Sequence, residues 1–450
     1  MFDTVLIANR GEIAVRVART CREMGIRTVA VYATPDRESA VVRQADRAVH
    51  LGPSPLKRSY LNIPAVIEAA RITGAQAIHP GYGFLSEDPD FAEICAANGM
   101  TFIGPPPSVM SRLGDKALAR SLMARAGLPV LPGSPEPVEH LSTAQEIAAG
   151  IGYPVIIKAV AGGGGRGMRV VRRAAEFARA YQEVRATAQA VFGDGRVYLE
   201  RYLESARHVE VQVLCDRHGN AVHLGDRDCS VQRRHQKLIE EAPAPGLSES
   251  LAARMAGAAV TGALSVGYVG VGTFEFLVDG EDFYLMEVNC RIQVEHPVTE
   301  MVTGIDLVRQ QLLVAAGEPL TIGQSDVVIR GAAIECRVNA EDASRGFVPA
   351  PGLLEVFEPP AGPFIRVDTH GYPGYRVPPN YDSLLAKAVV WAPDRPQAMA
   401  RMVRALDEFR IAGPGVRTSI DFVRTALNDP RFRAAEHDTT LTDRILATGG

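Results

Sequence analysis

The sequence predicts an α/β protein, with α+β character in parts, in which a parallel N-terminal domain precedes a mixed remainder. Three observations predict this class. Strand-like and amphipathic helical runs alternate through residues 1–114, which is typical of a parallel sheet with crossover helices. From about residue 205, alternating strands follow one another as an antiparallel pattern would. A mixed region with a Pro/Gly-rich part at residues 349–380 begins near residue 327.

Length and composition favour an intracellular enzyme of about three domains. The chain has 450 residues, of which 46% are hydrophobic and 22% charged, as in ordinary globular proteins. Its formal net charge of −4 gives no basic field for nucleic acid, and we find neither a signal peptide nor an 18-residue apolar run. The six cysteines are scattered without a C-x-x-C motif, so we expect reduced, mostly buried thiols and a cytoplasmic location without membrane partners.

The first domain, residues 1–114, is expected to follow a Rossmann-like βαβ layout. Its expected elements are a strand at 5–8, a helix at 12–24, a strand at 28–32, a helix at 63–73 and a strand at 77–78. No G-x-G-x-x-G motif is present, so a dinucleotide site is not predicted. The loop at residues 79–83 follows a strand, at the edge where open α/β sheets bind ligands, although His79 fits a structural role equally well.

Residues 115–326 are expected to form a second domain with a mobile lid at about 131–203, and residues 327–450 a third. For the second domain the expected elements are a helix at 108–126, a proline-rich linker at 129–137, strands at 154–160, 168–172 and 197–202, and helices at 249–266 and 306–316. For the third they are strands at 332–338 and 384–391 and helices at 394–410 and 416–428.

The segment from residue 273 to residue 297 carries the strongest chemical signal. Asp279-Gly280 is a turn signal between two alternating runs, which predicts a hairpin. A three-residue loop would pair Val278 with Tyr284, and would bring Glu275, Glu287 and Asn289 onto one face. Two carboxylates and an amide oxygen are ligands that Mg²⁺ prefers. The alternative is a solvated outer sheet face with scattered charge.

A glycine-rich loop joins two further predicted strands. Five of the six residues from Gly162 to Gly167 are glycine, so backbone N–H groups can approach phosphate oxygens closely. The loop is not a Walker A motif, because no G-K-[ST] follows. Lys158 precedes it, and only four other lysines occur in the chain: Lys57, Lys116, Lys237 and Lys387. Such a lysine supplies a compact charge that arginine does not, although a lid without a ligand stays the alternative.

Three polar segments complete the candidate site. Glu200 ends a strand whose exposed main chain could contact an adenine edge. Residues 232–237 hold three permanent cations and an imidazole, which favours an anion site over a solvated basic loop. Arg337 interrupts an apolar strand pattern, where it fits a structural ion pair as well as a functional role.

Nine motifs together resemble the biotin carboxylase members of the ATP-grasp superfamily, over nearly the whole chain. They are IANRGEIA (7–14), HPGYGFLSE (79–87), KAVAGGGGRGMRVV (158–171), HVEVQVL (208–214), RDCSVQRRHQK (227–237) with EEAPAP (240–245), GTFEF (272–276), RIQVEHPVTEM (291–301) and ECRVNAED (335–342). The resemblance implies an ATP-grasp fold and carboxylation of biotin by ATP and bicarbonate through carboxyphosphate.

The resemblance also implies residue roles. ATP would be bound by Lys116, Lys158, Gly162, Gly163, Gly164, Gly165, Arg166, Gly167, Glu200, Leu203, His208 and Gln232, with His235 in support. Mg²⁺ or Mn²⁺, with two ions expected, would be bound by Glu275, Glu287 and Asn289. Bicarbonate would contact Arg291, Gln293 and the Val294 main chain, and Glu295 would be the general base. Lys237 would contact the γ-phosphate and carboxyphosphate, while Arg337 and Tyr82 would face biotin.

Departures and absences refine this expectation. Cys290 stands where family members usually carry Thr or Pro, and it could expose a thiol to oxidation; Asp226 replaces a usual Glu. The biotinylation motif A-M-K-M is missing, so biotin is expected on a separate carrier protein or on a domain outside this sequence.

We therefore expect a carrier protein, a carboxyltransferase and a homodimer, in an acyl-CoA carboxylase. The alternatives are a 2-oxo acid carboxylase, an ATP-grasp ligase with another acceptor, and a non-catalytic nucleotide-binding protein. The sequence does not identify the final carboxyl acceptor.

Overall fold

The computed structural model describes residues 1–134, 136–160 and 167–448, and it confirms the α/β class. The N-terminal part contains a five-stranded sheet in the order β3-β2-β1-β4-β5, and every neighbouring pair is parallel, as predicted. Its elements are β1 (Thr4–Ile7), α1 (Gly11–Glu23), β2 (Arg27–Ala33), α2 (Ala40–Gln44), β3 (Arg47–Gly52), α3 (Ile63–Thr73), β4 (Ala77–His79), α4 (Pro89–Ala97) and β5 (Thr101–Phe102). The Asn9 amide, just after β1, donates to the carbonyls of Pro80 and Tyr82 at 2.7 Å, which fixes the loop after β4.

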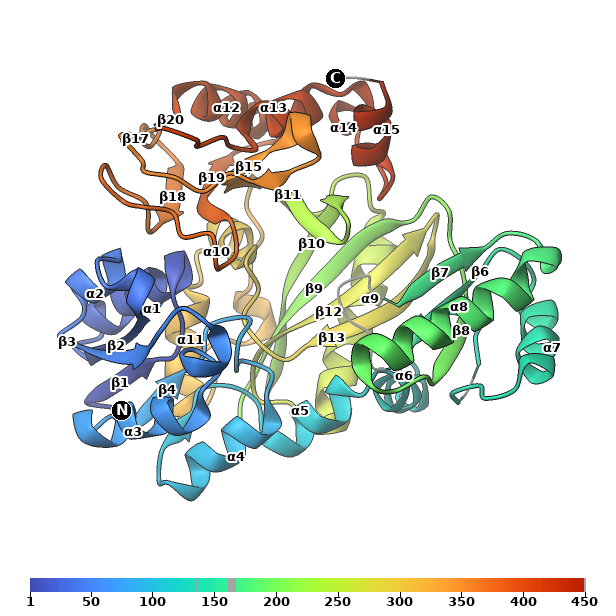
Figure 1. The fold of residues 1–450 in the computed structure, drawn as a ribbon, viewed down its shortest axis with the longest axis horizontal. Helices are drawn as coiled ribbons and strands as arrows, with labels where there is room; N and C mark the ends of the chain where they lie inside the picture. The colour runs from blue at the N-terminus through green and yellow to red at the C-terminus, as the bar shows by residue number, and fades with distance from the viewer. Residues whose placement is uncertain (135, 161–166, 449–450) are drawn as a thin grey trace.

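A second sheet of eight strands lies in the middle of the molecule (Figure 1). Its order is β13-β12-β9-β10-β11-β14-β19-β18, and all its pairs are antiparallel. The strands are β9 (Arg207–Cys215), β10 (Ala221–Arg233), β11 (Gln236–Ala242), β12 (Gly270–Asp279), β13 (Asp282–Asn289), β14 (Ala332–Asn339), β18 (Ile365–Thr369) and β19 (Leu384–Ala392). Because β11 pairs with β14, strands from the middle and C-terminal parts of the chain share one sheet, which local sequence patterns did not predict.

Helices cover this sheet and continue to the C-terminus. Helix α9 packs against β9 and β10, and helix α12 packs against β14 and β19. The helices are α5 (Pro107–Gly114), α6 (Lys116–Arg125), α9 (Glu249–Val266), α10 (His296–Thr303), α11 (Leu307–Ala315), α12 (Arg395–Glu408), α13 (Ile420–Asn428), α14 (Pro430–Arg433) and α15 (Leu441–Ala447). Short paired strands complete this part, namely β15 (Glu341–Asp342) with β16 (Val348–Pro349) and β17 (Val356–Glu358) with β20 (Arg410–Ala412).

The prediction of a single helix at 108–126 is wrong, because the chain forms two helices, α5 and α6, that are separated at Asp115. The Asp115 carboxylate accepts hydrogen bonds from the N–H groups of Ala117 and Leu118 at 3.0 and 2.9 Å, which caps a new helix. This cap places Lys116 at the first position of α6 rather than within a continuous helix.

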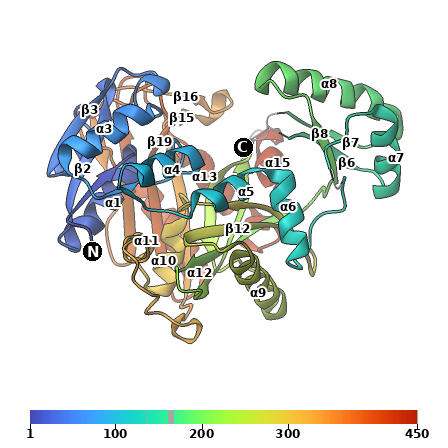
Figure 2. The ribbon, with the colours of Figure 1, turned by 90° about the horizontal axis from the view of Figure 1, so that it is seen from below.

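The predicted lid region forms a small unit beside the central sheet (Figures 1 and 2). Its three-stranded sheet, in the order β7-β6-β8, contains β6 (Val155–Ala159), β7 (Met168–Val171) and β8 (Val197–Arg201), and it is flanked by α7 (Leu141–Ile151) and α8 (Ala174–Phe192). A separate apolar core, which includes Phe177 and Leu199, holds this unit together. The β6–β7 antiparallel pair confirms the predicted strand–loop–strand hairpin, while residues 161–166, which include the predicted Gly162–Gly165 and Arg166, lie outside the described residues.

Two further expectations concern the whole chain. All six cysteines are buried and unpaired, as predicted. In the part of the chain that the structure describes, no helix combines the length and the apolar composition needed to cross a membrane.

Candidate active site

The ammonium group of Lys237 lies at the centre of three buried carboxylates. Its Nζ is 2.6 Å from Glu210 Oε2, 2.8 Å from Glu275 Oε1 and 2.6 Å from Glu295 Oε1. These carboxylates come from β9, from β12 and from the residue preceding α10, so three elements meet at one cation. Burial lowers the pKa of Lys237, but the acidic groups around it raise that pKa well above its usual value. The lysine is therefore a fixed positive charge that holds the cluster together.

Arg337 donates a hydrogen bond to the second carboxylate oxygen of Glu295. Its terminal guanidinium nitrogen is 3.0 Å from Glu295 Oε2, and its Nε donates to Glu240 Oε1 at 2.6 Å. Burial raises the pKa of Glu295, but Lys237 and Arg337 outweigh it and hold that pKa well below its usual range. Glu295 is therefore ionised with both oxygens bonded to cations, which makes it a weak base in this arrangement.

The hairpin of β12 and β13 has the predicted pairing of Glu275 with Glu287, but its turn differs from the predicted one. Glu275 lies opposite Glu287, which confirms that prediction. The predicted pairing of Val278 with Tyr284 is wrong, because the turn contains two residues rather than three and Val278 pairs one residue earlier. A bulge at Met286 then restores the register, so both glutamates still face each other.

Around Glu275 the hairpin gathers amide groups. Asn289 Nδ2 and Gln293 Nε2 donate to Glu275 Oε1 at 2.9 and 3.0 Å. Arg291 donates to Asn289 Oδ1 at 3.0 Å and to Gln293 Oε1 at 2.8 Å, so the predicted bicarbonate residues lie beside the predicted metal ligands. Glu287 lies on the same strand face as Asn289, but it pairs with Lys116 of α6 instead.

The donor set fits a divalent ion. Glu275 and Glu287 offer carboxylate oxygens from paired strands, and Glu287 keeps 38% of its side chain exposed. The side-chain N–H of Asn289 donates to Glu275. A 180° rotation of the amide about its χ2 bond would present the amide oxygen to an ion instead. We conclude that hard oxygen ligands are available here from all three predicted residues.

The lid side contributes a second set of ion pairs. Lys158 Nζ lies 2.5 Å from Glu200 Oε2, and Arg120 lies 3.1 Å from Glu200 Oε1. Across the opening, Lys116 Nζ lies 3.5 Å from Glu287 Oε2. Both predicted ATP lysines therefore face carboxylates here, and both are partly exposed, so a phosphate anion could compete for them.

The imidazole of His235 lies between the two sets. It is at the turn between β10 and β11, where its φ of 65° is in the left-handed region. Burial lowers the pKa of His235, and the nearby Lys158, His208 and Lys116 lower it further while Glu287 opposes them. The imidazole is therefore neutral and faces residues of both ion-pair sets.

His208 and Gln232 extend the carboxylate cluster beyond Glu275. His208 Nε2 lies 3.0 Å from Glu275 Oε2, and Gln232 Nε2 lies 3.4 Å from His208 Nδ1. Of the remaining predicted ATP residues, Leu203 is half-buried in the segment after β8, and Gly167 directly precedes β7 with a φ of 74°.

Tyr82 and Val294 meet at Lys387, a residue to which the sequence assigned no role. The Tyr82 hydroxyl donates to Glu12 Oε1, and Lys387 Nζ lies 3.1 Å from the same oxygen. Lys387 also donates to the Val294 carbonyl at 2.8 Å. Burial and Glu12 raise the pKa of Tyr82 while Arg337 lowers it, so Tyr82 lies within electrostatic range of that arginine.

The sequence argument missed several carboxylates and their partners. Glu210 is fully buried between Lys237 and Arg227, and Glu87 accepts from Arg291 Nε at 3.0 Å. The signal for Glu210 was available, because residues 208, 210 and 212 of HVEVQVL alternate polar side chains on one strand face. Glu87 lies far away in the sequence, so only the fold reveals its contact.

The two departures from the family pattern are accommodated. Cys290 is only 3% exposed, its N–H donates to Glu87 Oε1 at 2.9 Å, and burial raises the pKa of its thiol. The sequence left open whether this thiol is exposed, and the structure shows that it is buried. Asp226 accepts a hydrogen bond from the Ala244 N–H at 2.7 Å.

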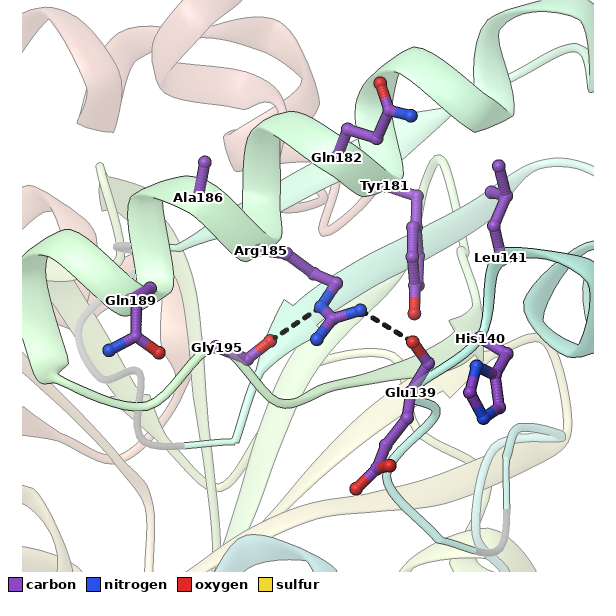
Figure 3. Close-up of a pocket in the computed structure, with 9 residues that line it drawn as sticks. All are labelled: Glu139, His140, Leu141, Tyr181, Gln182, Arg185, Ala186, Gln189 and Gly195. Atoms are coloured by element: carbon purple, nitrogen blue, oxygen red, sulfur yellow. Dashed lines mark hydrogen bonds between the residues drawn. The ribbon is translucent and has the colours of Figure 1, made fainter.

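A separate hollow of about 480 Å³ lies in the lid, between α8 and the segment before α7 (Figure 3). Arg185 crosses it and donates to the carbonyls of Gly195 and Glu139 at 3.2 and 2.6 Å. None of the predicted site residues that the structure describes lines this hollow, so we assign it no role.

Comparison with known proteins decides the family. Residues 1–110 match the biotin carboxylase N-terminal domain, residues 115–322 the ATP binding domain of the carbamoyl-phosphate synthase L chain, and residues 335–444 the biotin carboxylase C-terminal domain. The biotin carboxylase of Pseudomonas aeruginosa is 53% identical over 433 residues, which cover 96% of each chain. The chain belongs to the biotin carboxylase family.

Solved structures of biotin carboxylases agree with this assignment. A complex of the Campylobacter jejuni biotin carboxylase with β-γ-ATP is 48% identical, with a TM-score of 0.95 over 99% of each chain. The biotin carboxylase domain dimer of the Hydrogenobacter thermophilus 2-oxoglutarate carboxylase, in complex with MgADP, ADP and bicarbonate, is 45% identical, with a TM-score of 0.96 over 100% of this chain and 99% of that one. The predicted family and the predicted ATP-grasp fold are confirmed.

Proposed function

We propose that this chain is an ATP-dependent biotin carboxylase, an enzyme that uses ATP and bicarbonate to carboxylate biotin on a carrier protein. One arrangement carries the proposal: Lys237 links Glu295, the predicted base, to Glu275, the predicted metal ligand, while Arg337 holds the other side of Glu295. Membership of the biotin carboxylase family supports the same reaction.

The nucleotide would lie between the lid and the central sheet. Lys116 and Lys158 are paired with Glu287 and Glu200, and the phosphates of ATP would replace these carboxylates as their anions. His235 would contact the nucleotide as a neutral imidazole. The glycine loop of residues 162–167 is proposed to fold over the phosphates and keep water from carboxyphosphate, and movement of residues 131–203 stays a prediction.

Glu295 is proposed to take the proton of bicarbonate. Arg291, Gln293 and the Val294 main chain would hold this anion, whose planar shape suits the guanidinium fork. Lys237 would turn from Glu295 toward the γ-phosphate, and loss of this cation would raise the pKa of Glu295. Binding of ATP would thus convert a weak base into a stronger one. Arg337 would then hold the biotin ureido oxygen, near Tyr82.

Glu275, Glu287 and Asn289 are proposed to hold Mg²⁺ or Mn²⁺, with two ions expected. When bound, such ions neutralise and orient the phosphate oxygens. The support for this assignment is the chemistry of the three side chains and the pairing of Glu275 with Glu287 across β12 and β13.

The partners are proposed from family membership and the missing biotinylation motif. A homodimer is expected, and biotin is expected on a separate carrier protein or on a domain outside this sequence; a related domain is described as a dimer. The carboxyltransferase is expected to use an acyl-CoA; similarity to the domain of a 2-oxoglutarate carboxylase favours a 2-oxo acid as the second candidate. The domain boundaries 1–114, 115–326 and 327–450 stay proposals, supported by the similar limits of the family matches. The six buried, unpaired thiols support the cytoplasmic location that we propose.

The test is the dependence of ATP hydrolysis on its co-substrates. The proposal predicts turnover that requires bicarbonate and free biotin together, with N-carboxybiotin as product. ATP hydrolysis that depends on neither bicarbonate nor biotin would refute the proposal. Turnover with an amine or amino acid as acceptor would favour another ATP-grasp ligase, and ATP binding without any turnover would favour a non-catalytic protein.

A further inference from the structure

Two fully buried carboxyl groups face each other behind Arg337, where β11 meets β14. Glu240 and Glu335 are partners in this antiparallel ladder, so their side chains leave the same face of the sheet with Cβ atoms about 5 Å apart. Both residues are 0% exposed. Like charges in this position repel each other, and burial removes the water that would screen them.

The hydrogen bonds of the pair are sufficient for only one negative charge. Glu240 Oε1 accepts from Arg337 Nε at 2.6 Å. The other oxygen of Glu240 and both oxygens of Glu335 have no hydrogen-bond partner among the residues that the structure describes. A buried carboxylate without a donor is costly, whereas a carboxyl group that keeps its proton can share it with its neighbour.

The nearby cations are already balanced by other anions. Arg337 is shared with Glu295, and Lys387 faces Glu12 and the Val294 carbonyl. Burial raises the pKa of Glu240 to about 7 and that of Glu335 well above its usual value, which agrees with a retained proton. The charged and titratable groups around the pair are Arg337 of β14, Lys237 of β11, Lys387 of β19, Cys229 of β10 and Glu295 before α10, while Cys336 lies on the opposite face of β14.

We propose that Glu240 and Glu335 hold one proton between them at neutral pH, and that this singly charged pair positions Arg337. The ionised member is Glu240, which bonds the guanidinium, and the protonated member is Glu335. The single negative charge of the pair attracts one side of the Arg337 guanidinium, while Glu295 attracts the other side. A second charge would pull the guanidinium toward the pair and away from biotin. Glu335 is thus a positioning residue, and its effect on catalysis rests on the proposed function.

Thermal unfolding between pH 5 and pH 9 tests the proton directly. Because the pKa of Glu335 is raised in the folded state, the wild type loses stability as pH rises above the unfolded pKa near 4.5. The variants Glu335→Gln and Glu335→Met carry no proton to lose, so their Tm relative to wild type should rise by about 1–3 °C per pH unit. The control Asp368→Asn removes a buried carboxylate that is ion-paired, and its Tm should lie below that of wild type throughout.

A constant Tm difference for both Glu335 variants would overturn the proposal, because it would mean that Glu335 ionises normally. Failure of both variants to fold would also overturn it, since the site of a neutral carboxyl group should tolerate a neutral amide or a thioether of similar size. These readouts need no turnover, so they stand apart from the proposed function.

The positioning role has its own readout in the KM for biotin. In the wild type, KM should rise roughly tenfold at alkaline pH as the pair loses its proton and the charge-assisted contact of Arg337 weakens. In Glu335→Gln this alkaline rise should be absent, while kcat follows the wild-type profile. Parallel KM profiles would overturn the positioning role. Absence of biotin-dependent turnover in the wild type would instead reject the proposed function. The unfolding experiment would then still test whether Glu240 and Glu335 share a proton.

Discussion

Arg16 and Glu300 lie 284 residues apart in the sequence, yet a terminal guanidinium nitrogen of Arg16 is 2.9 Å from Glu300 Oε1. The other oxygen of Glu300 accepts from Arg366 at 2.6 Å. One carboxylate therefore ties α1, α10 and β18 together. Because α10 begins directly after Glu295, these contacts fix the helix that follows the proposed base against α1 and β18.

Glu300→Gln should destabilise the protein by about 1–3 kcal/mol, because it removes the anion that Arg16 and Arg366 share and leaves each guanidinium with only one carboxylate partner, Asp306 or Asp368. Chemical denaturation with a two-probe check for intermediates measures this loss. The matched control is Glu68→Gln, which removes an exposed pair with Arg71 and should leave the midpoint unchanged. Equal effects in both variants would show that the buried contact has no special weight.

Glu295→Gln should bind ATP with an affinity close to that of wild type but lose about 10²–10⁴-fold in biotin-dependent turnover, as expected when a general base is removed. Calorimetric ATP titration and a phosphate-release assay measure the two quantities. Glu281→Gln, in the exposed β12–β13 turn, serves as the control and should keep full turnover. Full activity in the Glu295 variant would rule out its role as base.

Glu275→Gln should raise the Mg²⁺ concentration that half-saturates nucleotide binding by at least about tenfold, because even outer partners of metal ligands have effects of that size. Mn²⁺ titration followed by electron paramagnetic resonance, with nucleotide present, measures the site directly. Asp282→Asn, at the exposed end of the same hairpin, should leave the titration unchanged. An unaltered titration in the Glu275 variant would place the metal elsewhere.

We expect the folded protein to lose stability at acid pH because Asp368 becomes protonated there. Burial raises its pKa, but Arg366 and Lys387 outweigh this and lower the pKa of Asp368 to about 2. The folded pKa is thus below the unfolded value of about 3.9, so this carboxylate stabilises the protein above pH 4 and the contribution disappears as pH falls toward 2. Asp368→Asn should be less stable than wild type at pH 7, with a gap that closes between pH 4 and pH 2 in denaturant titrations. A gap that does not vary with pH would contradict this assignment.

Cys290 should react with alkylating reagents only after unfolding. Its side chain is buried and burial raises the pKa of the thiol, so little thiolate is present at neutral pH. The rate of modification, compared between wild type and Cys290→Thr under native conditions, should be the same in both. A faster phase found only in the wild type would show that this thiol opens to solvent.

Local patterns were sufficient for the N-terminal sheet and for much of the hairpin. Alternating strand and helix runs predict parallel pairing because crossover helices separate the strands, and β1, β2 and β4 follow that rule. The pairing of Glu275 with Glu287 was predicted with the wrong turn. It holds because the bulge at Met286 compensates for the missing turn residue, and a bulge has no sequence signal as clear as a turn dipeptide.

The sequence by itself determined the family, the polar face of the hairpin and the residue types that the proposed chemistry needs, since these depend on side-chain identity and short-range spacing. Only the tertiary structure decided which charges meet: Lys237 with three carboxylates, Lys387 with Glu12, and Glu240 opposite Glu335. The physical reason is that strand pairing over long separations creates these contacts. Burial then sets the protonation of each group, and neither effect is present in a local stretch of chain.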